Sequence, residues 1–285
     1  MQNPTVPIRQ AHHILYFEDF TMNVMEMFSL KGKVALVTGA GNRIGYGAQC
    51  AEALYEAGAE VYIASRNLEK LNAFAEKYPG MKVIQLDLED ENQVKKIIPE
   101  IIKRSGQLDI LVNNAVARTA LAKWDLNMAD FDRSFHANSS ALFVLTRIAA
   151  EAMKSKGGSI INIASYMGML GLDHANYAGT GMQTDNIEWP SPAYHYEKGG
   201  MINFTRWAAS VLGRYNIRVN SVSLIGLEPL EGERSQFQKQ HAARTLLDRC
   251  CGHEDLKGGI VYLASKASDF VTGTNLVIDG GYSAI

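Results

Sequence analysis

The chain contains a tyrosine and a lysine, Tyr194 and Lys198, whose spacing could support proton transfer. In a helix, side chains four positions apart lie on one face, so the phenol and the ammonium would point the same way. A tyrosine has a pKa of about 10, and close positive charges could lower that pKa by ~2–3 units, which requires about 3–4 kcal/mol. The pair could then exchange a proton with an alcohol or a carbonyl, although incidental surface pairs share this spacing.

The residues before this pair are typical of a helix start. Ser191 suits the N-cap position and Pro192 suits the first helical position, so Tyr194 is expected in the first turn. The helix dipole stabilises an anion at that end, and a phenolate is an anion. The predicted helix would therefore help Tyr194 to act as a base.

A glycine-rich segment, residues 38–45, follows the first apolar run of the chain. Between a strand and a helix, such a turn lets backbone N–H groups approach a pyrophosphate. The dinucleotide pattern G-x-G-x-x-G is incomplete, because Ile44 stands where its third glycine should be. A tight turn without a ligand is the alternative interpretation.

The second apolar run ends at Ser65 and Arg66, with no acidic residue over 64–66. An NAD site needs a carboxylate there for the ribose 2′-hydroxyl, whereas an arginine can hold a 2′-phosphate. The sequence therefore favours NADP over NAD. The alternative is that Arg66 is only a solvated start of the next helix.

Apolar runs of strand length alternate with segments of helical periodicity along the chain. This alternation predicts an α/β fold, a Rossmann-type doubly wound parallel sheet in a single domain, with ligands at the carboxyl ends of the strands. The expected strands are 34–37, 60–64, 81–86, 108–112, 159–163, 217–222 and 275–278, and the expected helices are 44–57, 68–78, 91–104, 128–153 and 192–212.

Two further segments complete the expected organisation, in which residues 28–285 form the domain. Residues 1–27 would be an N-terminal extension of unknown use, and the start could lie at Met22, Met25 or Met27 instead. Residues 166–193 are rich in Gly, Asn and Asp, and we expect a long loop there beside the active site.

Composition argues against several classes of function. The formal net charge is −2 and no Lys/Arg block occurs, so nucleic acid is not an expected partner. No apolar run reaches the ~18 residues of a membrane span. Three cysteines, two of them adjacent, suit neither a disulfide framework nor a zinc site, which favours the cytoplasm. No carboxylate or cysteine stands at a ligand-like spacing from His174 or His195 on the same element, so no metal is expected.

Four motifs in order resemble the short-chain dehydrogenase/reductase family: Thr38-Gly39 with Gly45, the segment 158–165 ending at Ser165, the pair Tyr194 and Lys198, and the closing segment 272–281. The resemblance implies hydride transfer between NAD(P) and a carbonyl or secondary alcohol. It also implies a homo-oligomer, a dimer or a homotetramer, formed in part by the helices 128–153 and 192–212.

The same resemblance implies particular roles for individual residues. Asn138, Ser165, Tyr194 and Lys198 would be catalytic, with Ser165 bonded to the substrate oxygen and Asn138 organising a relay water. A serine that only caps a loop is the alternative for Ser165. Cofactor contacts are implied for Gly39, Asn42, Arg43, Ile44, Gly45, Arg66, Asp87, Leu88, Asn114, Ala115, Tyr194, Lys198 and Leu227.

Departures from the family pattern keep other functions open. Arg43 and Val116 stand where the family has glycine, and Leu224 and Ile225 stand where it has Pro-Gly. A non-catalytic dinucleotide sensor or scaffold is therefore one alternative. The polar side chains of the 166–193 loop favour a sugar, a polyol or a related hydroxy compound as substrate. A hydrophobic ketone or an acyl thioester is the other alternative.

Overall fold

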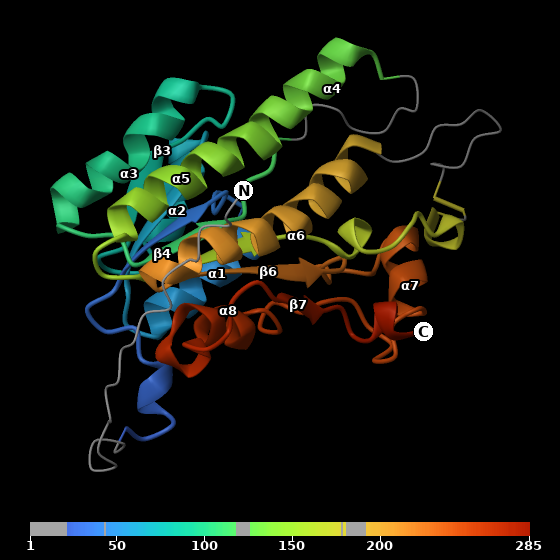
Figure 1. Ribbon diagram of the computed structural model, residues 1–285. Helices are drawn as coiled ribbons and strands as arrows, with labels where there is room; N and C mark the ends of the chain where they lie inside the picture. The colour runs from blue at the N-terminus through green and yellow to red at the C-terminus, as the bar shows by residue number, and fades with distance from the viewer. Residues whose placement is uncertain (1–21, 43, 118–125, 178, 181–191) are drawn as a thin grey trace, which may run out of the picture.

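The computed structural model describes residues 22–42, 44–117, 126–177, 179–180 and 192–285 (Figure 1). In this part of the chain a parallel sheet of seven strands has the order β3-β2-β1-β4-β5-β6-β7. Its strands are β1 (Val34–Thr38), β2 (Glu60–Ser65), β3 (Lys82–Gln85), β4 (Ile110–Asn113), β5 (Gly158–Ile163), β6 (Ile217–Leu224) and β7 (Asn275–Ile278). The order reverses direction between β1 and β4, where doubly wound sheets bind ligands.

Helices cover both faces of the sheet, as the predicted fold class requires (Figure 1). On one face lie α1 (Tyr46–Glu56), α2 (Leu68–Ala75) and α8 (Lys257–Ala264), and on the other lie α3 (Glu91–Ser105), α5 (Ala141–Met153) and α6 (Pro192–Leu212). Alternate residues of β1 point to the two faces, so Val37 packs in one core cluster and Leu36 in the other. Every residue of β1 is buried, which explains its continuous apolar run.

The prediction of one helix over 128–153 is wrong in one respect, because this segment is not a single regular helix. It consists of α4 (Met128–Phe135), a π-turn (His136–Ser140) and α5. A π-turn interrupts the regular hydrogen-bond ladder, and such turns are often found at functional sites. Asn138 lies in the middle of this one, and its side chain bonds the backbone of Ala117 instead of facing solvent.

The helices α7 (Gln236–Ala242) and α8 were not predicted from the sequence. Of the expected N-terminal extension, residues 1–21 lie outside the described residues, and Glu26–Phe28 form a short 3-10 turn. Of the expected loop 166–193, residues 178 and 181–191 also lie outside, Ser191 among them. Across the described ranges, no helix is both long enough and apolar enough to span a membrane.

Candidate active site

A cleft of about 1280 Å³ opens at the carboxyl ends of the strands. It is lined by the glycine-rich turn after β1, by the segments that follow β4, β5 and β6, and by the first turns of α6. Arg43 lies outside the described residues. The other predicted site residues all line this cleft: Gly39, Asn42, Ile44, Gly45, Arg66, Asp87, Leu88, Asn114, Ala115, Asn138, Ser165, Tyr194, Lys198 and Leu227.

The glycine-rich turn packs tightly against the end of β4. Gly39 has a φ of +76°, and a Cβ there would lie 2.6 Å from the Cα of Ala115. The Asn114 side chain donates a hydrogen bond of 2.9 Å to the Thr38 carbonyl, so it ties the two segments together. A Cβ on Gly47 would overlap the Gly39 carbonyl oxygen, so this residue in the first turn of α1, which the sequence reasoning missed, allows the helix to approach the glycine-rich turn closely.

The N-terminus of α1 faces the same cleft and has the features of an anion site. Its N-cap, Gly45, has no side chain, and no side-chain hydrogen bond caps this end of the helix. The first N–H groups of the helix therefore remain available to a bound anion. At the rim, Arg66 is exposed, and the next residue, Asn67, caps α2 by accepting a bond from the Lys70 backbone N–H.

Tyr194 and Lys198 share one face of α6, as their spacing predicts. The Nζ atom of Lys198 lies 5.5 Å from the centroid of the Tyr194 ring. Lys198 is only 4% exposed, and its Nζ donates a hydrogen bond of 2.6 Å to the carbonyl of Ile163. Burial lowers the pKa of Lys198 to about 8, and the nearby charge of Glu197 opposes that effect.

Ser165 lies two residues after the end of β5 and is buried. Its Oγ accepts a bond of 3.2 Å from the Met167 backbone N–H, so it caps the short turn that follows the strand. The same hydroxyl lines the cleft. Because the oxygen accepts in the cap, its hydrogen can still be donated to a ligand, and the two interpretations of Ser165 are compatible.

Asn138 and Glu197 form a buried network at one side of the cleft. Asn138 exchanges two bonds with the Ala117 backbone, accepting from its N–H at 2.8 Å and donating to its carbonyl at 3.0 Å. It also donates to Glu197 Oε2 at 2.9 Å, while Ser134 donates to Glu197 Oε1 at 2.7 Å. The sequence reasoning missed Glu197, because a charged residue on a helix usually indicates a solvated face.

The departures at Leu224 and Ile225 are compatible with a cleft at this position. Both residues are buried and line the cleft, and so does the half-buried Val116. The hydroxyl of Tyr46, another residue that sequence reasoning missed, donates a hydrogen bond to the Ile225 carbonyl. This bond joins the start of α1 to the segment after β6, so the two sides of the cleft are fixed to each other.

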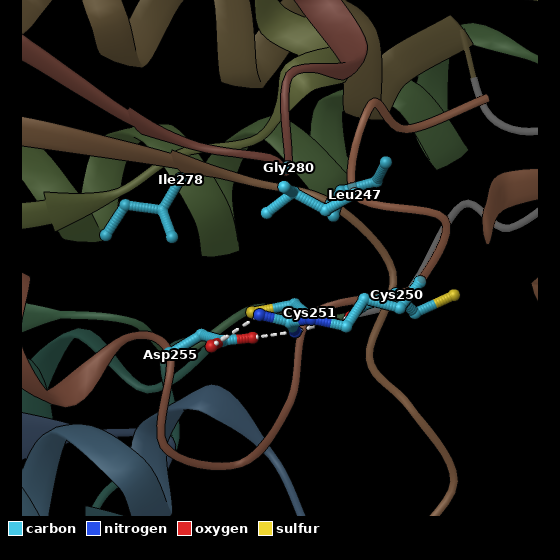
Figure 2. Close-up of a pocket in the computed structure, with 8 residues that line it drawn as sticks. Leu247, Cys250, Cys251, Asp255, Ile278 and Gly280 are labelled. Carbon is cyan, nitrogen blue, oxygen red and sulfur yellow. Dashed lines mark hydrogen bonds and ion pairs between the residues drawn. The ribbon is translucent and has the colours of Figure 1, made fainter.

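A smaller cavity of about 150 Å³ is also lined by Ile225. Figure 2 shows this cavity from one side. Cys250 and Cys251 line it, with their sulfur atoms directed to different sides, and an ion pair between Arg249 and Asp255 forms part of its wall. Burial raises the pKa of Cys251 to about 11, so this group is a thiol at neutral pH. Among the described residues, no group of three or more His, Cys, Asp or Glu could hold a metal.

Comparisons with known proteins place this cleft in a family context. A family model described as enoyl-(acyl carrier protein) reductase matches residues 39–283. The chain is similar to an uncharacterized oxidoreductase of Escherichia coli (strain K12), YgcW, with 34% identity over 90% of this chain and 95% of that protein. It is also similar to the L-xylulose reductase of Mesocricetus auratus, with 30% identity over 89% of this chain and 97% of that protein.

Solved structures agree with these sequence relatives. A short-chain type dehydrogenase/reductase from Mycobacterium marinum has a TM-score of 0.78 and 31% identity, and the alignment covers 93% of this chain and 100% of that chain. A gluconate 5-dehydrogenase from Burkholderia cenocepacia, in complex with NADP and tartrate, has a TM-score of 0.79 and 28% identity, covering 92% and 100%. The chain therefore belongs to the short-chain dehydrogenase/reductase family, and it is an NAD(P)-dependent oxidoreductase of hydroxyl and carbonyl groups.

Proposed function

We propose that this enzyme transfers a hydride between NADP and a secondary alcohol or carbonyl of a sugar, a polyol or a related hydroxy compound. The observation that carries the proposal is that the Lys198 ammonium lies 5.5 Å from the Tyr194 ring centroid, in the same cleft as the glycine-rich turn. A dinucleotide fits that turn, because the uncapped N-terminus of α1 offers N–H groups to a pyrophosphate.

Each residue of the proposed mechanism has a separate task. The bound nicotinamide would supply or accept the hydride. The Ser165 hydroxyl donates to the substrate oxygen, and the Tyr194 hydroxyl gives that oxygen a proton or removes one. The Lys198 ammonium would favour the phenolate form of Tyr194 by its charge and would bind the ribose, while Asn138 would organise the route of the proton to water.

The remaining cofactor contacts follow the course of the cleft. Gly39, Asn42, Ile44 and Gly45 would hold the phosphates, and the same role is proposed for Arg43. Asp87 and Leu88 would contact the adenine. Asn114, Ala115 and Leu227 would line the path toward the nicotinamide. All of them except Arg43, which lies outside the described residues, line the cleft.

The preference for NADP rests on the end of β2. Ser65, Arg66 and Asn67 line the cleft there, and none of them is acidic. Lys70 lines the same end, so two cations are available to a 2′-phosphate. The gluconate 5-dehydrogenase with a similar structure contains NADP, which supports the same preference.

The substrate class is supported by the polar side chains of the cleft. Five polar side chains line it: His195, Glu228, Glu231, Gln238 and His241. Glu228 pairs with Arg234 and Gln238 bonds Ser235 and Leu227, so His195 and Glu231 are the ones proposed to bond substrate hydroxyl groups. L-xylulose reductase and gluconate 5-dehydrogenase, to which the chain is similar, are named for sugar-derived substrates. A reductase of acyl thioesters is the second candidate, favoured by the description of the matching family model.

The test combines cofactor titration with a substrate screen. NADPH and NADH are titrated by nicotinamide fluorescence, and sugars, polyols, hydrophobic ketones and 3-oxoacyl thioesters are then offered to the wild type and to Tyr194→Phe. We expect tighter binding of NADPH and turnover of a polyhydroxylated compound that Tyr194→Phe lacks. Turnover of ketones or thioesters alone would replace the substrate class, and cofactor binding without Tyr194-dependent turnover would indicate a sensor.

We also propose a homo-oligomer, a dimer or a tetramer, in the cytoplasm. Phe143 of α5 and Trp207 of α6 are 45% and 54% exposed, and their apolar rings would be covered by a second copy of the chain. The cysteines are all free thiols and buried, which suits a reducing compartment. Light scattering after size-exclusion chromatography tests the assembly, since a monomeric mass at micromolar concentration would contradict it.

A further inference from the structure

Glu197 stands between Tyr194 and Lys198 in the sequence of α6, and the mechanism proposed above gives it no role. Its side chain is only 6% exposed, although carboxylates are among the residues least often buried. It lines the cleft together with Ser134, Asn138 and Lys198. A buried carboxylate at this place therefore requires a physical explanation.

The hydrogen bonds of Glu197 fit its ionised form. Oε1 accepts from the Ser134 hydroxyl at 2.7 Å, and Oε2 accepts from Asn138 Nδ2 at 2.9 Å. Both donors are neutral. Because both oxygens act as acceptors, the carboxylate needs no proton to satisfy this arrangement.

The carboxylate also fixes a chain of contacts that reaches the end of β4. Asn138 holds the backbone of Ala117 through two hydrogen bonds, and Ala117 follows the cleft residues Ala115 and Val116. Glu197 thus connects α6 to the π-turn, and the π-turn to the segment that lines the cleft after β4. A side chain at position 197 without acceptors would leave Asn138 Nδ2 with one partner fewer.

Charge is the second consequence of this position. Lys198 is buried and donates to a neutral carbonyl at 2.6 Å, so its hydrogen bond supplies no counter-charge. Burial raises the pKa of Glu197, and the charge of Lys198 opposes that rise. Burial lowers the pKa of Lys198, and among the described residues the charge of Glu197 opposes that effect. The neighbouring groups from α4 and from the π-turn, Ser134 and Asn138, are uncharged.

We propose that Glu197 is a positioning residue whose buried carboxylate holds Asn138 in place and keeps the Lys198 side chain charged. The inference rests on the proposed function, because it assigns Glu197 a part in preparing the same proton transfer. A structural role alone would need only the two hydrogen bonds. The proposal needs the negative charge as well.

The experiment separates charge from hydrogen bonding. Glu197→Gln has nearly the same shape and can still accept from Asn138, but it has no charge. Glu197→Asp keeps the charge on a shorter side chain. Glu151→Gln makes the same change at an exposed residue of α5 and is the matched control. Turnover and the dissociation constant of NADPH are both measured as functions of pH, the latter by nicotinamide fluorescence.

We expect the loss of activity and of NADPH affinity at high pH to begin about one pH unit lower in Glu197→Gln than in the wild type. Glu197→Asp should restore the wild-type position at least in part, and Glu151→Gln should leave it unchanged. Superimposable pH profiles of the wild type and Glu197→Gln, with or without a lower maximum, would overturn the proposal.

A second variant covers the case in which Glu197→Gln does not fold. Ser134→Ala removes one donor to the carboxylate, so the pKa of Glu197 rises and its charge is lost at a higher pH. Activity should therefore begin to fall at a higher pH on the acidic side, and an unchanged acidic side would again overturn the proposal. If the wild type binds no NADPH at any pH, the proposed function itself fails, which is a different result from binding with unshifted profiles.

Discussion

The Nζ atom of Lys198 lies 2.6 Å from the carbonyl oxygen of Ile163, the last residue of β5. This hydrogen bond fixes the ammonium at the strand end that also carries Ser165. The position of the cation therefore depends on the backbone of β5 as well as on α6. Burying a cation with a neutral acceptor is unfavourable for folding, and that leads to the first prediction.

Lys198→Met should abolish turnover and stabilise the folded chain at pH 7. Burial lowers the pKa of Lys198 from 10.5 to about 8, so the unfolded chain binds this proton more tightly than the folded chain. The stability of the wild type should therefore rise as the pH increases from about 8 to 10.5, and the full unfavourable term is present below about 8. Burying the charged Lys198 costs about 3 kcal/mol, which Lys198→Met removes, while the loss of the hydrogen bond to Ile163 costs the variant about 1 kcal/mol.

Urea unfolding at pH 7 and at pH 10 measures this effect. The variant should exceed the wild type by about 2 kcal/mol at pH 7, and the difference should become smaller at pH 10. A variant that is less stable than the wild type at both pH values contradicts the argument. The cofactor is left out of these measurements, because its binding would stabilise the wild type separately.

Gly47→Ala should weaken cofactor binding and reduce stability. The new Cβ would overlap the backbone oxygen of Gly39 and the side-chain nitrogen of Asn114, which its hydrogen bond to the Thr38 carbonyl holds in place. We expect a loss of about 1–3 kcal/mol in the free energy of unfolding. Gly258→Ala is the control, because that Cβ meets no atom within 4 Å and lies in the exposed part of α8. The control should gain roughly 0.5–1 kcal/mol in the free energy of unfolding. Thermal unfolding of both variants with and without NADPH measures the difference, and equal stability of the two variants would contradict the prediction.

Tyr46→Phe should loosen the junction between α1 and the segment after β6. The variant leaves the Ile225 carbonyl without this donor, at a cost of about 1–2 kcal/mol. Burial raises the pKa of Tyr46, so the phenol remains a donor throughout the ordinary pH range. Tyr55→Phe is the control, since it removes a similar bond from α1 to the exposed Pro79 carbonyl. The KM for the cofactor should rise several-fold in the first variant only, and a comparable rise in both would show that the position is unimportant.

Arg66→Ala should reduce the affinity for NADPH more than that for NADH. A charged hydrogen bond to the 2′-phosphate is worth about 1.5–3 kcal/mol, which corresponds to at least tenfold in the dissociation constant. Arg104→Ala removes an exposed arginine of α3, paired with Glu100, and should change neither constant. Parallel fluorescence titrations with both cofactors give the ratio, and an unchanged ratio in Arg66→Ala would reject the preference for NADP.

The sequence was sufficient for the fold because the fold depends on local patterns. The central strands β1 and β4 are nearly continuous apolar runs, and the pair Tyr194 and Lys198 lies within about one helical turn, so both could be recognised in a short window. The short helix α8 was not predicted because its first half contains two glycines and its second half is apolar, without the alternation of a half-exposed helix. Its stability comes from packing against α1 and the sheet.

Glu197 was missed for a different reason. Its partner Ser134 lies 63 residues earlier in the chain, and the meeting of α4 with α6 is a result of tertiary packing. Tyr46 is similar, because the acceptor of its hydroxyl is 179 residues away. Such contacts have no local signature, and their discovery requires coordinates.

The π-turn at His136–Ser140 has a consequence for the phase of the helix that contains it. Its hydrogen bonds span one residue more than those of an α-helix, and one residue corresponds to a rotation of about 100°. This offset lets Asn138 face the cleft while Ala149 and Met153, further along, face the core. Deleting one residue within 136–140 would rotate the two parts of the helix relative to each other. The apolar face of α5 could then no longer face the core while the amide of Asn138 faces the cleft.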